Sequence, residues 1–330
     1  LEILIWVALA VLLVMGTPIF VSLGMASITV LLLSDIPLSL VMIDLIKVSD
    51  MFPLLAVGGF VFAGALMERG GMAAQIVEVA SMLVGHIRGG LGIVTILGCM
   101  FFASMIGSGP GTVAAMGSIM IPSMIKRGYS PEYAAGVSAT GGTLGILIPP
   151  SIMLVFMGSA ANVSVGQLFY GAIIPGLLLG AAYIVYIKIV AVVKKDYAPP
   201  MPAEQLARYS RKQVIWGVIV NVLPVALVIF SVLGAIWLGW CPATEAAALG
   251  VVASFLIALL THSINAQVIK KTLIESIKLT SMVYAVSAFG NLFVTVFMRL
   301  GCSNAVTNLF VHLPLGNAAI LEAQLLMLGS

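Results

Sequence analysis

Small hydroxyl-bearing residues gather at two places where glycine and proline interrupt long apolar stretches of the sequence. The first place is residues 104–112, and the second is residues 140–151, which contain two consecutive prolines. Neutral hydroxyls and unwound carbonyls are oxygen ligands that suit a hard cation such as sodium, whereas N–H groups at a helix N-terminus bind an anion. Together, the two stretches predict a site for a sodium ion and an anionic substrate.

Two overlapping sets of residues are the candidates for this site. Helix C-termini and freed carbonyls suit the sodium ion, whereas helix N-termini suit the anion. The sodium candidates are Ser104, Gly107, Ser108, Thr140, Gly141, Gly145 and Pro149, and the substrate candidates are Ser108, Gly109, Thr112, Pro150 and Ser151. No cofactor and no metal other than sodium is expected.

The composition shows where these residues must lie. Of the 330 residues, 61% are hydrophobic and only 8% are charged, whereas a soluble domain carries about 25% charged residues. Apolar stretches recur along the whole chain, and many are long enough to approach or cross a hydrocarbon core of about 30 Å. The chain is therefore predicted to be an all-α polytopic protein embedded in a lipid bilayer. Soluble enzymes and nucleic-acid binders are excluded.

The two interrupted stretches differ in kind. Residues 90–106 and 112–125 would form helical arms of about 25 and 21 Å, both too short for a full crossing. Basic residues flank both arms, which places both outer ends on the cytoplasmic side. A re-entrant hairpin is therefore preferred over a pair of crossings. Residues 131–159 begin as a helix after Ser130, but Pro149 and Pro150 remove two backbone donors, which predicts a discontinuous helix.

The remaining stretches predict further helices. Residues 1–33 are expected to break at Pro18, residues 37–49 to form an interfacial amphipathic helix, and residues 196–212 to form a cytoplasmic linker. Further spans are predicted over residues 52–67, 165–193, 214–238, 243–260 and 280–298, with short helices over 72–85 and 304–312.

The second half repeats the order of the first. Leu23-Gly24 recurs as Leu249-Gly250, and the span end at residues 67–71 recurs at 298–301. The basic ends of corresponding spans fall on opposite sides, which is typical of an inverted-topology repeat. A second hairpin is expected after the second arm, so the second repeat is interpreted as truncated at Ser330.

The chain is predicted to divide into five parts. These are 1–88, first-repeat scaffold helices and arm; 89–165, transport-domain hairpin and broken helix; 166–213, a transmembrane helix and the linker; 214–312, second-repeat scaffold helices and arm; and 313–330, an incomplete C-terminal segment.

Two other functions fit less well. Ser108 between two glycines suggests an intramembrane hydrolase, but a nucleophile needs a base within hydrogen-bond reach, and the three histidines lie at predicted span ends. An ion channel needs a continuous polar path or a charged ring, and the apolar spans offer almost none. The chain is therefore not expected to be an enzyme.

Several segments resemble a known family: GGFVFAGALMERGGMAAQIVEVASMLVGHIRGGLG, FFASMIGSGPGTVAAMGSIMIPSMIKRGYSPEYAAGVSATGGTLGILIPPSIMLV, GQLFYGAIIPGLL and CPATEAAALG. They are similar to the large membrane subunit of tripartite ATP-independent periplasmic (TRAP) transporters. Members typically carry a bulkier or methyl-bearing residue where this chain has Pro110 and Gly111.

The resemblance implies an elevator-type, sodium-coupled secondary importer of a small organic acid, such as a C4-dicarboxylate or sialic acid, in the bacterial inner membrane. It implies two partners, a small four-helix membrane subunit and a periplasmic substrate-binding protein. The alternative is an ion-coupled carboxylate carrier that works without a binding protein.

Overall fold

The computed structural model describes residues 2–34, 36–161, 163–194, 197–200, 211–261 and 264–302, which form helices and connecting turns without a β-strand. Within these residues, six helical segments are long and apolar enough to cross a membrane: Phe52–Arg69, Pro131–Ala161, Val165–Val193, Lys212–Trp237, Ala243–Leu260 and Ala266–Arg299. The expectation of an all-α membrane protein is confirmed. The predicted linker lies largely, and the short helix over 304–312 wholly, outside the described residues.

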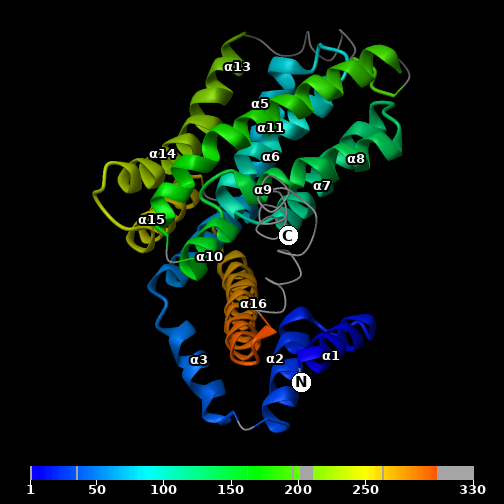
Figure 1. Cartoon of the computed structure of the whole chain (residues 1–330). Helices are drawn as coiled ribbons and strands as arrows, with labels where there is room; N and C mark the ends of the chain where they lie inside the picture. The colour runs from blue at the N-terminus through cyan, green and yellow to red at the C-terminus, as the bar shows by residue number, and fades with distance from the viewer. Residues whose placement is uncertain are drawn as a thin grey trace. The chain divides into compact units, whose positions relative to one another are not determined.

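The chain divides into two compact units. One consists of the N-terminal residues through Asp50 together with the chain from Met282 onward, and the other consists of Met51–Ser281. Helix α16 (Ala266–Arg299) contributes its first half to the second unit and the rest to the first. Figure 1 shows the helices and their labels.

The N-terminal unit begins with the predicted break. Helix α1 (Glu2–Val14) and helix α2 (Ile19–Leu32) are separated at Gly16, which has a φ of +76°, and at Pro18, which precedes α2. Helix α3 (Ser39–Ser49) follows. The buried core of this unit joins α1, α2 and α3 to the end of α16 through Ile5, Val30, Leu31, Leu40, Leu292 and Val296.

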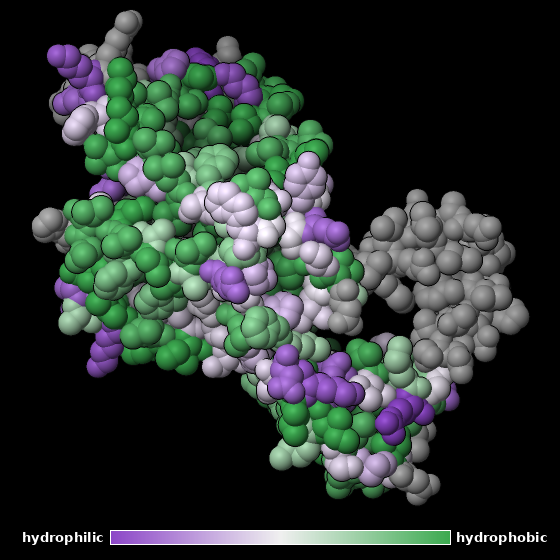
Figure 2. All heavy atoms as spheres, turned by 90° about the vertical axis from the view of Figure 1, so that its left-hand side faces the viewer, coloured by the Kyte–Doolittle hydropathy of each residue, from purple (hydrophilic) through white to green (hydrophobic). Residues whose placement is uncertain are grey.

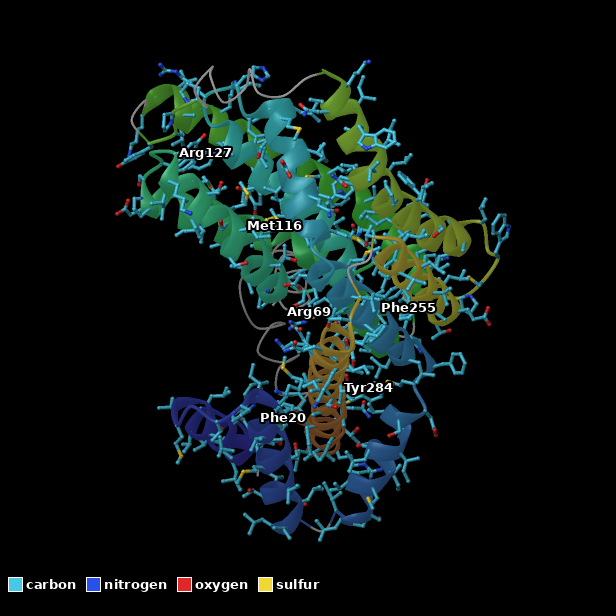
Figure 3. All side chains as sticks on the ribbon, turned by 180° about the vertical axis from the view of Figure 1, so that it is seen from behind. Phe20, Arg69, Met116, Arg127, Phe255 and Tyr284 are labelled. Atoms are coloured by element: carbon cyan, nitrogen blue, oxygen red, sulfur yellow. The ribbon has the colours of Figure 1, made fainter. Side chains whose placement is uncertain are left out.

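The second unit is built around helix α6 (Gly90–Ile106). Helix α4 (Leu55–Arg69) begins after the short 3₁₀ turn η1 (Phe52–Leu54), and α5 (Met72–Val84) follows it. Helices α4, α5 and α7 (Gly109–Lys126) all pack on α6. Met116 of α7 is labelled in Figure 3. A Cβ on Gly98 of α6 would lie 2.3 Å from the Met116 Cε atom, so the two helices are tightly packed at this point.

The predicted discontinuous helix is confirmed as three pieces, α8 (Pro131–Gly142), α9 (Leu144–Leu147) and α10 (Ile152–Ala161). Helix α11 (Val165–Val193) then runs uninterrupted through Pro175. Helices α8, α9 and α11 pack against α6, and α7 packs against both α8 and α9. The hairpin and the break are thus parts of one packed core.

Three further helical stretches complete the described chain. Helices α13 (Arg211–Gly217) and α14 (Leu223–Trp237) are joined by the π-helical turn η2 (Val218–Val222), which ends just before Pro224. Helix α15 (Ala243–Leu260) packs on α4 and α14. The sequence predicts a separate span over 280–298, whereas the structure shows one continuous helix from Ala266 to Arg299.

Large apolar side chains remain exposed over these helices. Tyr170 and Leu178 of α11 and Phe230 of α14 are each about two-thirds exposed. Apolar residues cover much of the face in Figure 2. Because soluble proteins rarely expose contiguous apolar surface of this extent, these side chains are suited to contact lipid.

Candidate functional site

The hairpin tip consists of a helix C-terminus and a helix N-terminus that are two residues apart. Gly107 caps the C-terminus of helix α6 with a φ of +62°, which lies in the left-handed region, and its N–H donates to the Ala103 carbonyl at 2.9 Å. Ser108 caps α7, because its Oγ accepts from the Gly111 N–H at 3.4 Å. The tip therefore presents carbonyl oxygens and N–H groups close together, as an ion and an anion would require.

Thr112 lies one turn into α7 and is fully buried. Both its N–H and its hydroxyl donate to the Ser108 carbonyl, at 2.9 and 2.8 Å. In this conformation the Ser108 carbonyl is already satisfied by two donors, while the lone pairs of the Thr112 hydroxyl oxygen remain as acceptors. Of these two oxygens, the hydroxyl of Thr112, a predicted substrate ligand, therefore keeps the greater free acceptor capacity.

The helix break provides the second half of the site. Ile148 leaves the helical conformation with a ψ of 121°, and Pro149 and Pro150 are both buried between α9 and α10. Ser151 is fully buried, and its hydroxyl donates back to the Ile146 carbonyl at 2.6 Å. The break is held in shape by its own hydrogen bonds.

The tip and the break interlock through their backbones. The Ile152 N–H, at the start of α10, donates to the Gly107 carbonyl at 3.2 Å. At Gly145 of α9, a Cβ would lie 2.7 Å from both the Ser108 carbonyl oxygen and the Thr112 Oγ1. The candidates Gly107, Ser108, Thr112, Gly145 and Ser151 are therefore brought together.

Two other candidate glycines sit at neighbouring helix contacts. A Cβ on Gly109 would lie 3.2 Å from the Gly142 carbonyl oxygen, so α7 and α8 meet at this point. A Cβ on Gly141 would lie 2.6 Å from the Cys99 sulfur of α6. Gly141 therefore allows α8 to approach α6, and this packing accounts for its presence.

Ser104 faces a different side of α6. It is buried, its hydroxyl donates to the Phe101 carbonyl at 2.7 Å, and together with Pro150 it lines a cavity of about 20 Å³. Residues of α4, α14 and α15 complete this cavity, among them Gly250 and Ser254. The cavity has room for about one water-sized particle.

Thr140 and Pro149 are placed apart from the tip. The Thr140 side chain is exposed on α8, and its carbonyl already accepts from the N–H and the hydroxyl of Thr143. Pro149 lines an apolar groove of about 350 Å³ between α6, α11 and α14, together with Ser104. The predicted sodium ligands are thus distributed over more than one face of the interlocked elements.

Tyr183 of α11 is a polar contact that sequence reasoning missed. Its hydroxyl lies 2.9 Å from the Thr143 hydroxyl, which joins α11 to the turn between α8 and α9. A tyrosine inside an apolar span needs a partner for its O–H group, and this requirement is the signal that could have identified it.

The comparisons with known proteins bear on the whole chain. The model of the family "Tripartite ATP-independent periplasmic transporter, DctM component" matches residues 6–329. The C4-dicarboxylate TRAP transporter large permease protein DctM of Pseudomonas aeruginosa is 41% identical over 279 residues, which are 83% of this chain and 63% of that protein. Its namesake in Vibrio cholerae is 42% identical over 247 residues, 74% of this chain and 53% of that protein.

A more distant relative is the sialic acid TRAP transporter permease protein SiaT of Haemophilus influenzae. It is 29% identical over 286 residues, which are 85% of this chain and 45% of that protein. The chain therefore spans less than two thirds of the length of the first two relatives. Because the family model covers nearly every residue, the chain belongs to the family of DctM components of tripartite ATP-independent periplasmic transporters.

Proposed function

We propose that this chain is part of a permease that imports a small organic acid by sodium-coupled secondary transport. Membership of the DctM family is the observation that carries the proposal. A C4-dicarboxylate is the first substrate to test, because relatives named for that substrate are 41% and 42% identical to the chain.

The interlocked tip supports binding of both an ion and an acid. The C-terminal ends of α6 and α9 bring negative dipole ends to the site, whereas α7 and α10 bring N-terminal ends. Neutral oxygens of Ser108, Thr112 and Ser151 lie among these ends. A sodium ion bound there would offset part of the charge of a carboxylate, so the binding of each would strengthen the binding of the other.

The proposal includes two partners and an elevator movement. A small four-helix membrane subunit would stand beside the scaffold, and a periplasmic binding protein would deliver the substrate. The hairpin and the broken helix would move as a transport domain in the bacterial inner membrane. The inverted-topology repeat would supply the scaffold and both arms.

The test is uptake of labelled succinate into vesicles that contain the permease, its small subunit and a loaded binding protein. A sodium gradient should drive uptake, and a proton gradient at matched membrane potential should not. Proton-driven uptake that ignores sodium would contradict the ion assignment. Uptake by the permease without the binding protein would instead support a conventional carboxylate carrier.

A further inference from the structure

The two halves of the sequence place carboxylates at equivalent positions. When Met67 is aligned with Met298, no gap is needed back to the preceding amphipathic stretch, and Gly59 aligns with Gly290. The same register pairs Asp44 with Glu275. Each half therefore carries an acid on the amphipathic stretch before its span, and each span ends with a basic residue. From here on, this stretch is called the arm of its half: α3 in the first half and the first half of α16 in the second.

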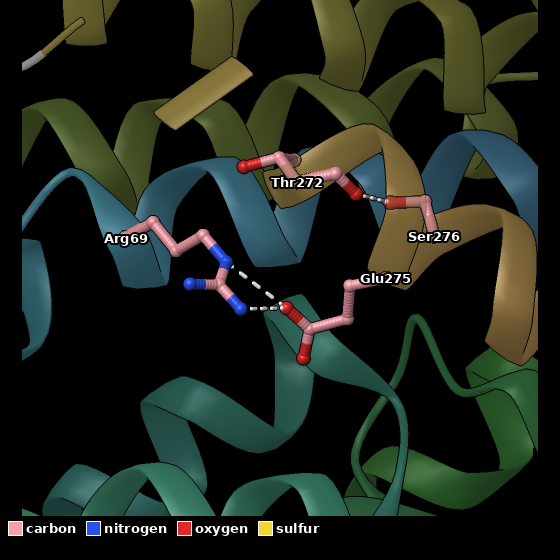
Figure 4. A network of polar contacts seen from close by, with 4 residues as sticks. All are labelled: Arg69, Thr272, Glu275 and Ser276. Atoms are coloured by element: carbon pink, nitrogen blue, oxygen red, sulfur yellow. Dashed lines mark hydrogen bonds and ion pairs between the residues drawn. The ribbon is translucent and has the colours of Figure 1, made fainter. Parts of the chain in front are cut away.

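In the second unit this acid is paired. Arg69, the last residue of α4, donates through Nε at 3.0 Å and also through Nη2 to the Oε2 atom of Glu275 on α16 (Figure 4). The contact joins the span of the first repeat to the arm of the second. It is partly exposed, with 35% and 38% of the two side chains open to the surroundings.

In the N-terminal unit the equivalent acid has no hydrogen-bond donor. Asp44 is fully buried, and neither of its carboxylate oxygens has a hydrogen-bond partner in the described chain. The only ion pair it makes there is with Lys47, whose Nζ lies 3.5 Å from Oδ1 and whose side chain is 61% exposed. A buried carboxylate with so few contacts is costly unless donors reach it.

The matching basic residue lies in the same unit. Arg299 ends α16, one position before the residue that aligns with Arg69, and it is exposed. Leu40, one turn before Asp44, belongs to the same buried cluster as Val296 and Cys302, which flank Arg299. A guanidinium group carries five donors in a planar fork that matches a carboxylate.

We propose that Asp44 is the docking site for Arg299, and that this ion pair forms in a conformation in which the pair between Arg69 and Glu275 is open. This inference rests on the proposed function, in which the two halves form an inverted repeat and differ in conformation within one state of the transport cycle. The two ion pairs then act as alternating latches, one on each arm.

The first experiment is charge exchange in the complete transporter. Asp44→Asn and Arg299→Gln should each lower uptake by about tenfold, which is the size of a typical coupling between sites. The double variant should be no worse than either single variant, and Asp44→Arg with Arg299→Asp should recover uptake. Lys47→Gln is the matched control and should retain uptake. Additive losses, no recovery on exchange, or a loss in the Lys47 control alone would overturn the proposal.

The second experiment needs no transport. A cysteine-free background receives cysteines at positions 44 and 299, at 69 and 275, or at all four, and a short bifunctional thiol reagent is applied to membranes. Each pair should crosslink alone, whereas the four-cysteine protein should rarely carry both crosslinks on one molecule. Absence of the 44–299 crosslink, or frequent double crosslinking, would overturn the latch. If these crosslinks form but the wild-type transporter takes up no acid, the latch is supported and the proposed function is contradicted.

Discussion

Residues 44–70 and residues 275–301 share the spacing of one acid, one lysine, two methionines and two glycines, but they fold differently. In the first half, the arm α3 and the span α4 are separated by η1, which contains Pro53. In the second half, arm and span form the single 34-residue helix α16. The position that aligns with Pro53 is Tyr284, which keeps its backbone N–H group.

This difference shows that a single proline can decide whether two helical segments are separate or form one continuous helix. A proline removes one N–H donor and clashes with the carbonyl one turn before it, so it ends the preceding helix. No proline occurs between residues 264 and 300. The two arms therefore share an acid followed three residues later by a lysine, but they differ in stiffness.

The largest effect is expected from moving the proline. Tyr284→Pro should destabilise α16 by about 3 kcal/mol or more and lower both protein yield and thermal unfolding temperature in detergent. Pro53→Ala should leave the unfolding temperature nearly unchanged. If Tyr284→Pro were as stable as the wild type, α16 would not act as one helix.

A glycine in the site should have the next largest effect. Gly145→Ala places a Cβ 2.7 Å from two oxygens of the hairpin tip, and overpacking of this kind costs about 1–3 kcal/mol. Uptake should fall at least tenfold, with the protein still present in the membrane. Gly136→Ala on α8 is the matched control, because its Cβ meets nothing within 4 Å. Equal uptake by both variants would show that the interlock is not needed.

The aligned glycines Gly59 and Gly290 should respond in opposite directions. A Cβ on Gly59 would lie 2.9 Å from the Ala247 Cβ, whereas a Cβ on Gly290 meets nothing within 4 Å. Gly59→Ala should lower the unfolding temperature. Gly290→Ala should raise stability by about 0.5–1 kcal/mol, because alanine favours a helix. A shift in the same direction for both would mean that the two spans are packed alike.

The smallest signal tests whether the halves are inverted. Cys241 is partly exposed between α14 and α15, whereas Cys99 and Cys302 are buried. Met15 is the position equivalent to Cys241 when Leu23-Gly24 is aligned with Leu249-Gly250. A membrane-impermeant maleimide should therefore label Cys241 from one side of the membrane. The same reagent should label Met15→Cys, in a Cys241→Ser background, from the other side. Burial and the nearby Glu245 raise the pKa of the Cys241 thiol, so its labelling should accelerate as the pH rises above 7. Labelling from the same side would contradict inversion.

Helix ends were predictable wherever proline, glycine or a charge marked them. Helices α11 and α15 begin and end where the sequence indicates, and the break at Pro149 and Pro150 is confirmed. The continuity of α16 was missed because its lysines suggested a separate interfacial segment. The π turn over Val218–Val222 was missed, although Pro224 lies just after it and lacks the N–H group that would bond one turn earlier.

Part of the candidate site was predictable for the same reason. The glycines and hydroxyls of the tip and the break were identified by type, but which of them meet depends on tertiary packing. Ser104 lines a small cavity with Pro150 and residues of α4, α14 and α15, and Thr140 is exposed, because the rotation of each helix about its axis is set by its neighbours. The contact between Tyr183 and Thr143 arises from packing in the same way.

The hydrogen bond from the Ile152 amide to the Gly107 carbonyl has a consequence for mutational scanning. Neither group belongs to a side chain, so Ile152→Ala keeps the N–H group in place. Gly107→Ala, in contrast, would place a Cβ 2.8 Å from the Ile152 N atom at a backbone φ of +62°, so its effect would combine steric strain with any loss of the bond. A scan of side chains therefore misses the bond at position 152 and cannot separate it from strain at position 107. A change to the backbone itself, such as an amide-to-ester substitution at position 152, would isolate it.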